Sequence, residues 1–393
     1  MTLDFPEDFA WGSATSAAQI ETASAHQFRG ISARDGAVFE RTTDHETRRS
    51  EDAELIARFG TTYVCSLDWA GLQREARAPL HEGRTAAYRG FFEDLRRRGV
   101  RVVLSLHHFA HPAWFESTGG WVWESNLEVF YDFVERVMQA FGDLVYAWNT
   151  FNEPNTYASH AYYRGVWPPH EQNLTKATRV AGNMGQAHLH LYAQIKRRFP
   201  DALVGYTLGT ASFEGKSLRA QATARLVDWW YYSRTVSLFA PTDYVGVSYF
   251  AHVPFAPRAL DVVEHRDRIE ALGLRHDDMY AISTSGLGDN LRRAHKHSGK
   301  PVWVMANGVC TVDDAFRQNV LGDYLREVHA CVRSGVPVVG YNVWAPWDNF
   351  EWHLGPSYRF GLLRTDPETL DRLDTGSARW YEAIAATGQV EIT

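Results

Sequence analysis

The sequence contains little cysteine and no long apolar stretch, and each absence excludes a class of protein. The 393 residues include 3 cysteines, Cys65, Cys310 and Cys331. They are too few and too widely spaced for a disulfide framework or a zinc-ligand motif. No apolar run reaches the roughly 20 residues that cross a bilayer. Met1 leads directly into a strand-like segment, which leaves no room for a secretory signal. We therefore expect a cytoplasmic protein that does not associate with membranes.

Charge of one sign is not concentrated in any part of the chain. The 40 basic and 47 acidic side chains give a net charge of −7, without a basic run or an acidic tail. Nucleic acids and anionic membranes are bound by clustered Lys and Arg side chains, so neither is a predicted partner. No glycine-rich phosphate loop or dinucleotide fingerprint follows any strand-like segment. The sequence therefore predicts no nucleotide cofactor.

Apolar runs and helical patterns alternate along the chain, which predicts parallel strands joined by right-handed crossovers. We place eight strands at 9–15, 61–69, 100–108, 144–152, 203–208, 244–250, 302–306 and 338–344. Amphipathic helices are predicted at 52–59, 88–98, 127–141 and 319–334. No linker, repeat or low-complexity segment interrupts the series. The predicted fold is α/β, a single (β/α)8 barrel over residues 1–393, with functional residues at the carboxyl ends of the strands.

Residues 148–155 (WNTFNEPN) place an amide and a carboxylate at the end of the fourth predicted strand. An apolar run leads into Asn152 and Glu153, and Pro154 ends the strand. A glutamate in this place costs free energy to desolvate, and a raised pKa suited to proton transfer is a common reason for it. A strand-end cap is the structural alternative for this pair of residues on its own.

This octet resembles the acid/base motif of glycoside hydrolase family 1, the family of many β-glucosidases and β-galactosidases. Residues 9–21 (FAWGSATSAAQIE) are similar to the N-terminal signature of that family. Residues 344–352 (WAPWDNFEW) and 358–362 (YRFGL) are similar to its sugar-binding segment. The resemblance runs through nearly the whole chain. It implies the same barrel fold and a small-molecule substrate of the β-glycoside type.

The resemblance also implies a pocket for one non-reducing sugar. Gln19 and Glu351 match the pair that binds adjacent hydroxyls, with the carboxylate as a charge-assisted acceptor. Trp344 matches the ring that stacks under the sugar. The other implied substrate-binding residues are His108, Asn152 (at the 2-hydroxyl), Trp352 and Phe360. A single buried His or Trp is more often a core residue, but this ordered set on separate strand ends favours a binding site.

The catalytic part of the resemblance is incomplete. A retaining glycosidase uses two carboxyl groups about 5–5.5 Å apart, one as acid/base and one as nucleophile. Glu153 matches the acid/base, with Asn152 beside it. The nucleophile of the family lies in the sequence Thr-Glu-Asn-Gly on strand seven, where residues 305–308 read MANG and the matching residue is Ala306. A methyl group cannot form the glycosyl-enzyme intermediate.

Residues near the lost nucleophile distinguish two origins for Ala306, an engineered Glu→Ala change and a natural loss. The family places an Arg and a Tyr beside the nucleophile, and Val64 and Phe250 stand at those positions here. Ser248 replaces an expected Asn. An Arg retained without its anion would be a buried unpaired charge, which costs several kcal/mol. The joint loss of these groups favours a natural origin.

Three hypotheses for function follow. In the first, Glu153 transfers a proton on a β-glycoside or sugar-like small molecule in altered or non-hydrolytic chemistry. The second is a nucleophile-knockout variant of a retaining β-glycosidase. The third is a pseudoenzyme that binds a sugar without turnover.

An inverting route would need a base about 6.5–9.5 Å from the acid. Asp68, His107 and His111 lie near suitable strand ends, although a structural role fits each of them better. Adjacent histidines on a strand point to opposite faces, so His107 and His108 do not predict a metal site.

Overall fold

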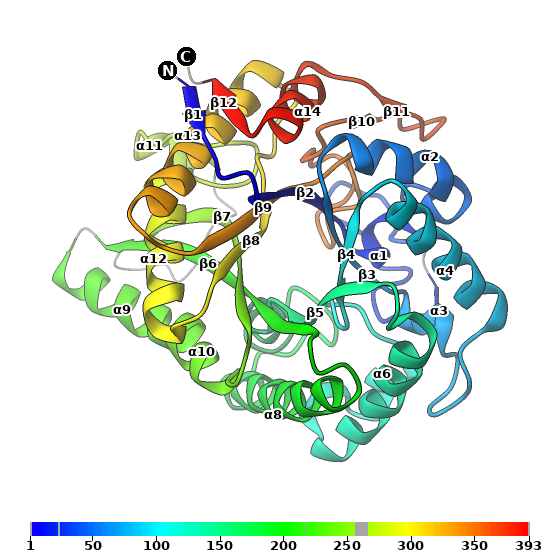
Figure 1. The fold of residues 1–393 in the computed structure, drawn as a ribbon. Coiled ribbons are helices and arrows are strands. Elements are labelled where there is room, and N and C mark those ends of the chain that lie inside the picture. The colour runs from blue at the N-terminus through cyan, green and yellow to red at the C-terminus, as the bar shows by residue number, and fades with distance from the viewer. Residues whose placement is uncertain (1, 23, 216, 256–265, 392–393) are drawn as a thin grey trace.

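The computed structural model describes residues 2–22, 24–215, 217–255 and 266–391, and it contains a closed barrel of parallel strands inside a ring of helices (Figure 1). Each barrel strand pairs with its neighbour along the chain, and the first pairs with the last to close the barrel. The predicted (β/α)8 fold is confirmed. The barrel strands are β2 (Ala10–Ala14), β3 (Thr62–Ser66), β4 (Arg101–Ser105), β5 (Val145–Asn152), β6 (Leu203–Gly215), β7 (Tyr244–Phe255), β8 (Val302–Asn307) and β9 (Val338–Trp344).

The helix predicted at 127–141 has those bounds, whereas the other three predicted helices begin earlier than the apolar periodicity indicates. Two of those predicted, at 88–98 and 319–334, start at Glu82 and Asp314. Their first turns are polar and are held by caps; the Asp313 carboxylate, for example, accepts a hydrogen bond from the Phe316 amide. The main helices are α2 (His45–Arg58), α4 (Glu82–Arg97), α6 (Leu127–Phe141), α8 (Leu174–Arg198), α9 (Leu218–Asp228), α12 (Thr284–Ser298), α13 (Asp314–Arg333) and α14 (Gly376–Thr387).

Shorter elements fill the connections. They are β1 (Thr2–Asp4), α1 (Ala17–Ile20), α3 (Trp69–Leu72), α5 (Ala113–Ser117), α7 (Pro154–Tyr157), α10 (Arg234–Leu238), α11 (Arg266–Ala271), β10 (Arg364–Thr365), β11 (Arg372–Leu373) and β12 (Gln389–Glu391). Strands β1 and β12 pair antiparallel, which brings the two ends of the chain together (Figure 1). No helix within the described ranges is long and apolar enough to cross a membrane.

Strands β6 and β7 are longer than predicted. Beyond the barrel they continue to pair with each other, from Ala211 opposite Ala251 to Gly215 opposite Phe255. Helix α9 packs on this extension through a small apolar cluster that includes Ala220, Ala224 and Val253. Figure 1 shows the extension and α9 reaching out from the barrel. The predicted strand ends at 208 and 250 missed this extension, because residues 209–215 (GTASFEG) lack an apolar run and residues 251–255 (AHVPF) contain a histidine and a proline.

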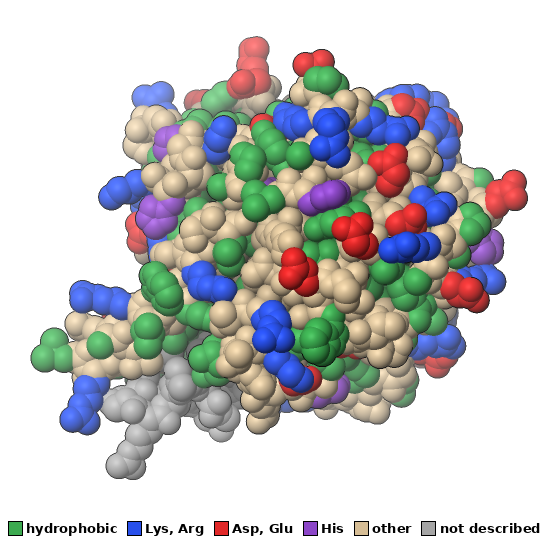
Figure 2. Space-filling model, turned by 90° about the horizontal axis from the view of Figure 1, so that it is seen from below, with side chains coloured by type: hydrophobic (Ala, Val, Ile, Leu, Met, Phe, Trp, Pro, Cys, Tyr) green, Lys and Arg blue, Asp and Glu red, His purple; other side chains and the backbone are tan. Residues whose placement is uncertain are grey.

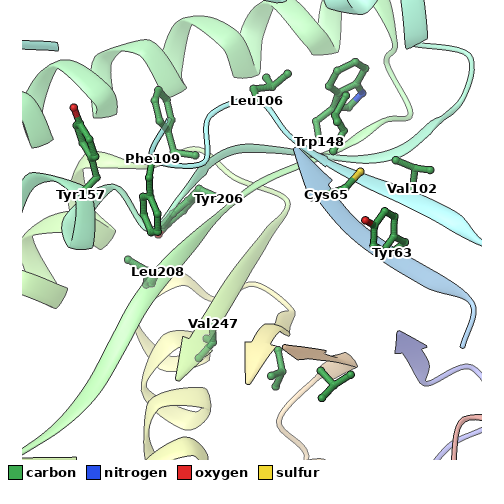
Figure 3. Packing of buried hydrophobic residues seen from close by; sticks show 14 of the residues in the cluster. Tyr63, Cys65, Val102, Leu106, Phe109, Trp148, Tyr157, Tyr206, Leu208 and Val247 are labelled. Carbon is green, nitrogen blue, oxygen red and sulfur yellow. The ribbon is translucent and has the colours of Figure 1, made fainter. Parts of the chain in front are cut away.

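Side chains alternate between two apolar layers along each strand, as the pleat requires. Tyr63, Val102 and Trp148 point outward into the layer between barrel and helices, as part of the packing in Figure 3. Their neighbours in the chain point inward. Val64, next to Tyr63, and Ala147, next to Trp148, belong to a second apolar cluster in the barrel interior. On the surface, acidic and basic side chains are interspersed on the face in Figure 2.

Candidate active site

A cavity of about 460 Å³ opens at the carboxyl ends of the barrel strands. Every site residue predicted from the sequence lines it. These residues are Gln19, Val64, His108, Asn152, Glu153, Ser248, Phe250, Ala306, Trp344, Glu351, Trp352 and Phe360. Residues that lie more than 300 positions apart in the chain therefore share one cavity, because parallel strands of a barrel all end on the same side. Their individual roles remain predictions.

A connected set of polar groups forms one wall of the cavity. The Gln19 amide nitrogen donates to Glu351 Oε2 at 3.1 Å and to Asn349 Oδ1 at 3.1 Å. Its amide oxygen accepts a hydrogen bond from Ser16 Oγ at 2.8 Å. Burial, opposed by this amide and assisted by the charge of Glu153, raises the pKa of the Glu351 carboxyl to about 8. At neutral pH the carboxyl is therefore mostly protonated and can donate a hydrogen bond as well as accept one.

A second polar pair lies beside two tryptophan rings. Asn152 Nδ2 and His108 Nε2 are 3.0 Å apart. Burial lowers the pKa of His108 to about 3, so the imidazole is neutral and its Nε2 accepts the hydrogen bond from the amide. The His108 ring lies 5.9 Å from the Trp344 ring and 6.2 Å from the Trp352 ring, centroid to centroid. Flat rings beside hydrogen-bonding groups suit a sugar, which has apolar faces and polar edges.

Glu153 lies where β5 passes into α7 and has a left-handed backbone conformation, with φ of 45°. This conformation costs a non-glycine residue about 1–3 kcal/mol and is concentrated at functional sites. Its carboxylate accepts a hydrogen bond from Thr156 Oγ1 at 2.7 Å. Removal from bulk water raises the pKa of Glu153, and the hydroxyls of Thr156 and Ser248 partly offset that increase. A raised pKa suits a carboxyl that gives and takes protons near neutral pH.

Close backbone approach on β6 holds the Glu153 carboxylate in place. A Cβ atom added to Gly209 would lie 2.5 Å from Glu153 Oε2 and 3.0 Å from the Tyr231 hydroxyl. The Tyr231 hydroxyl is in turn 2.6 Å from Thr156 Oγ1. Gly209, Thr156 and Tyr231 are functional candidates that the sequence reasoning missed. Of the three, only Thr156 could have been found from local sequence. It lies three residues after Glu153, in the first helical turn after Pro154, where its hydroxyl can reach the carboxylate.

Another wall of the cavity, which includes Ala306, is apolar. Ala306 and Val64 belong to the barrel-interior cluster together with Met305, and Phe250 packs against that cluster. The Phe250 ring meets the Phe360 ring edge to face at 5.7 Å. Ser248 is the Cα partner of Ala306 across β7 and β8. A carboxylate at position 306 would have Val64 in place of a cation, so its ionised form would not be stabilised.

The three candidate substitute bases lie outside this cavity. Asp68 accepts a hydrogen bond from the Gly71 amide at the start of α3 and pairs with Arg84 at 2.7 Å. His111 pairs with Glu116 at 2.7 Å, and His107 stacks on His111. These contacts match the structural roles expected of all three. The described part of the chain contains no group of three or more His, Cys, Asp or Glu side chains that could hold a metal ion.

Comparison with known proteins matches almost the full chain to one family. The model of glycosyl hydrolase family 1 matches residues 1–236 and 240–390. A curated relative, beta-glucosidase A of Acetivibrio thermocellus, is 24% identical, and the match covers 97% of this chain and 98% of that protein.

Solved structures of glycosidases have the same fold. The beta-glycosidase from Pyrococcus horikoshii superposes with a TM-score of 0.86 at 26% identity, over 100% of this chain and 97% of that chain. The Thermotoga maritima beta-glucosidase, 23% identical, superposes over 99% of this chain in complexes with deoxynojirimycin (TM-score 0.89, 100% of that chain) and with isofagomine lactam (TM-score 0.90, 100% of that chain). The chain belongs to glycosyl hydrolase family 1.

Proposed function

We propose that this protein binds a β-glycoside or a sugar-like small molecule and acts on it by proton transfer through Glu153, without a covalent glycosyl-enzyme intermediate. The observation that carries the proposal is the contrast between Glu153 and Ala306 within one cavity. Glu153 keeps a strained backbone, a raised pKa and a hydrogen bond from Thr156. Ala306 supplies only a methyl group in an apolar cluster. A proton can be given or taken, but no nucleophile is available at position 306.

The neighbours of Ala306 favour a natural change of chemistry over a knockout of an ordinary β-glycosidase. Val64 and Phe250 carry no charge and no hydroxyl, although the family resemblance places an Arg and a Tyr there. A single engineered Glu→Ala change would have left both. An apolar wall also stabilises a developing cation poorly. The proposed chemistry is therefore non-hydrolytic. Because the nucleophile is missing, the reaction differs from the hydrolysis that the family resemblance implies.

Glu153→Gln tests the proposal, since it removes the ionisable group and keeps the side-chain shape. A panel of β-glycosides is incubated with the protein, and loss of substrate is followed by mass spectrometry for hydrolytic and non-hydrolytic products alike. Turnover should fall about a hundredfold or more in the variant. Deoxynojirimycin binding, measured by titration calorimetry, should stay within about threefold because the hydroxyl-binding residues are unchanged.

Two outcomes would contradict this function. If deoxynojirimycin binds but no β-glycoside is turned over by either protein, the chain is a sugar-binding pseudoenzyme. If Glu153→Gln leaves turnover unchanged, proton transfer is carried by another residue.

A further inference from the structure

Residues 277–281, which precede α12, occupy a place that β8 leaves open. Strand β8 ends at Asn307, one residue after Ala306, whereas β7 continues to Phe255. Beyond the end of β8, the His252 amide on β7 donates a hydrogen bond to the Ala281 carbonyl at 2.9 Å. The other edge of β7 is already paired with β6. Residues next to Ala281 therefore lie just above the strand that carries Ala306.

Asp277 holds this segment in a tight turn against the chain after β8. One carboxylate oxygen accepts hydrogen bonds from the amides of Met279 at 2.7 Å and Tyr280 at 2.6 Å. The other accepts from the Cys310 amide at 2.9 Å, and the Asp278 amide donates to the Cys310 carbonyl at 2.8 Å. The position of Tyr280 is thus fixed by contacts to both β7 and the end of β8.

The Tyr280 side chain lines the cavity and packs against the apolar cluster that contains Ala306. Burial raises the pKa of its phenol well above the ordinary value, and the charges of Glu351 and Glu153 raise it further. Tyr280, Glu153 and Glu351 line the same cavity. The phenol stays protonated at any physiological pH and presents an O–H donor.

We propose that the Tyr280 hydroxyl donates a hydrogen bond to an oxygen of the bound substrate, in the part of the cavity bounded by Ala306, and so acts as a catalytic residue. The proposal rests on the proposed function, since it needs the same cavity and Glu153. A phenol at this wall also has the opposite electrostatic effect to the carboxylate that the family resemblance implies there. A carboxylate there would stabilise a developing cation, whereas a phenol O–H stabilises negative charge that develops on oxygen.

The chemistry that fits this arrangement is an elimination next to a carbonyl group. Glu153 removes a proton from the carbon beside the carbonyl, the C–H electron pair forms a carbon–carbon double bond, and the carbonyl π pair moves to the oxygen that Tyr280 binds. The carbonyl then re-forms, and the electron pair of the first carbon–carbon double bond forms a new one to the next carbon. The bond from that carbon to an oxygen leaving group breaks, and Glu153 returns the proton to that oxygen. The step needs no oxidant or reductant. Its substrate class is a sugar derivative that carries a carbonyl group.

Two probes of opposite character test the role of Tyr280. Isofagomine lactam is neutral and carries a carbonyl oxygen, whereas deoxynojirimycin is an amine and carries no carbonyl group. Their affinities are measured by titration calorimetry for the unaltered protein, for Tyr280→Phe and for Tyr146→Phe. Tyr146 is an exposed tyrosine under the Arg101 guanidinium, far from the cavity lining, and serves as the matched control.

Loss of one hydrogen bond to the lactam should weaken its binding to Tyr280→Phe about tenfold. Deoxynojirimycin should bind Tyr280→Phe within about twofold of the unaltered protein, because it has no carbonyl oxygen to accept this hydrogen bond. Tyr146→Phe should change neither affinity. Equal changes for both probes, or no change for the lactam, would overturn the proposal while the sugar site stands. If the unaltered protein binds neither probe, the proposed function fails and this role of Tyr280 fails with it.

Discussion

The two walls of the cavity differ in what holds their residues in place. On the polar wall, the Gln19 amide donates hydrogen bonds to Asn349 and to Glu351, and these contacts form without any contribution from position 306. On the apolar wall that contains Ala306, the Arg and Tyr that the family resemblance implies would serve only the nucleophile. Once the carboxylate is absent, a buried cation there has no partner and becomes costly. The polar residues of the first wall can therefore be kept after the chemistry changes, whereas the Arg and Tyr of the second wall cannot.

The largest expected effect comes from restoring charge to the apolar wall. Ala306→Glu should lower the free energy of unfolding by about 3 kcal/mol at neutral pH, because the apolar wall forces the new carboxyl to stay protonated where the unfolded chain would ionise it. Val64→Arg should have a similar effect, because it buries an unpaired charge. Combined, the two should cost less than their sum by about 2 kcal/mol, since the new charges pair. Chemical denaturation of both single variants and the double variant measures this coupling.

Ala222→Glu is the matched control, because Ala222 is exposed on α9 and the same substitution there should change the free energy of unfolding by less than about 0.5 kcal/mol. Strict additivity of Ala306→Glu and Val64→Arg would mean that the two positions are not electrostatically coupled, and the comparison of the walls would fail.

A smaller effect is expected on the polar wall, through the pH dependence of stability. The pKa of Glu351 is about 8 in the folded chain, above its ordinary value of 4.5. Between these values the folded chain keeps a proton that the unfolded chain releases, so stability falls as the pH rises through this window. Glu351→Gln stays neutral and should lose less Tm between about pH 5 and about pH 9 than the unaltered protein. Parallel Tm curves would show that the Glu351 carboxyl ionises normally.

The barrel could be predicted because each of its strands is a short apolar run between helical patterns. The site residues followed, since motifs at the ends of parallel strands must meet at one face. The extension of β6 and β7 could not be predicted, because residues 209–215 (GTASFEG) lack an apolar pattern and are held by pairing with residues between 248 and 255.

Tyr280 was missed for a related reason. It lies in no strand or long helix, and its position depends on a bond between Asp277 and Cys310, which are 33 residues apart. Local sequence carries no sign of such a contact. The same holds for Gly209, whose missing Cβ leaves room for the carboxylate of Glu153.

The measurement that tests the central claim most directly is kcat/KM for an activated aryl β-glucoside. It compares Ala306→Glu with a triple variant that also carries Val64→Arg and Phe250→Tyr. The apolar wall should keep the new glutamate protonated, so the single variant should stay as inactive as the unaltered protein. The kcat/KM of the triple variant should be about a hundredfold or more higher than that of Ala306→Glu. Fast hydrolysis by Ala306→Glu alone would contradict the account and identify the chain as a β-glycosidase disabled at one residue.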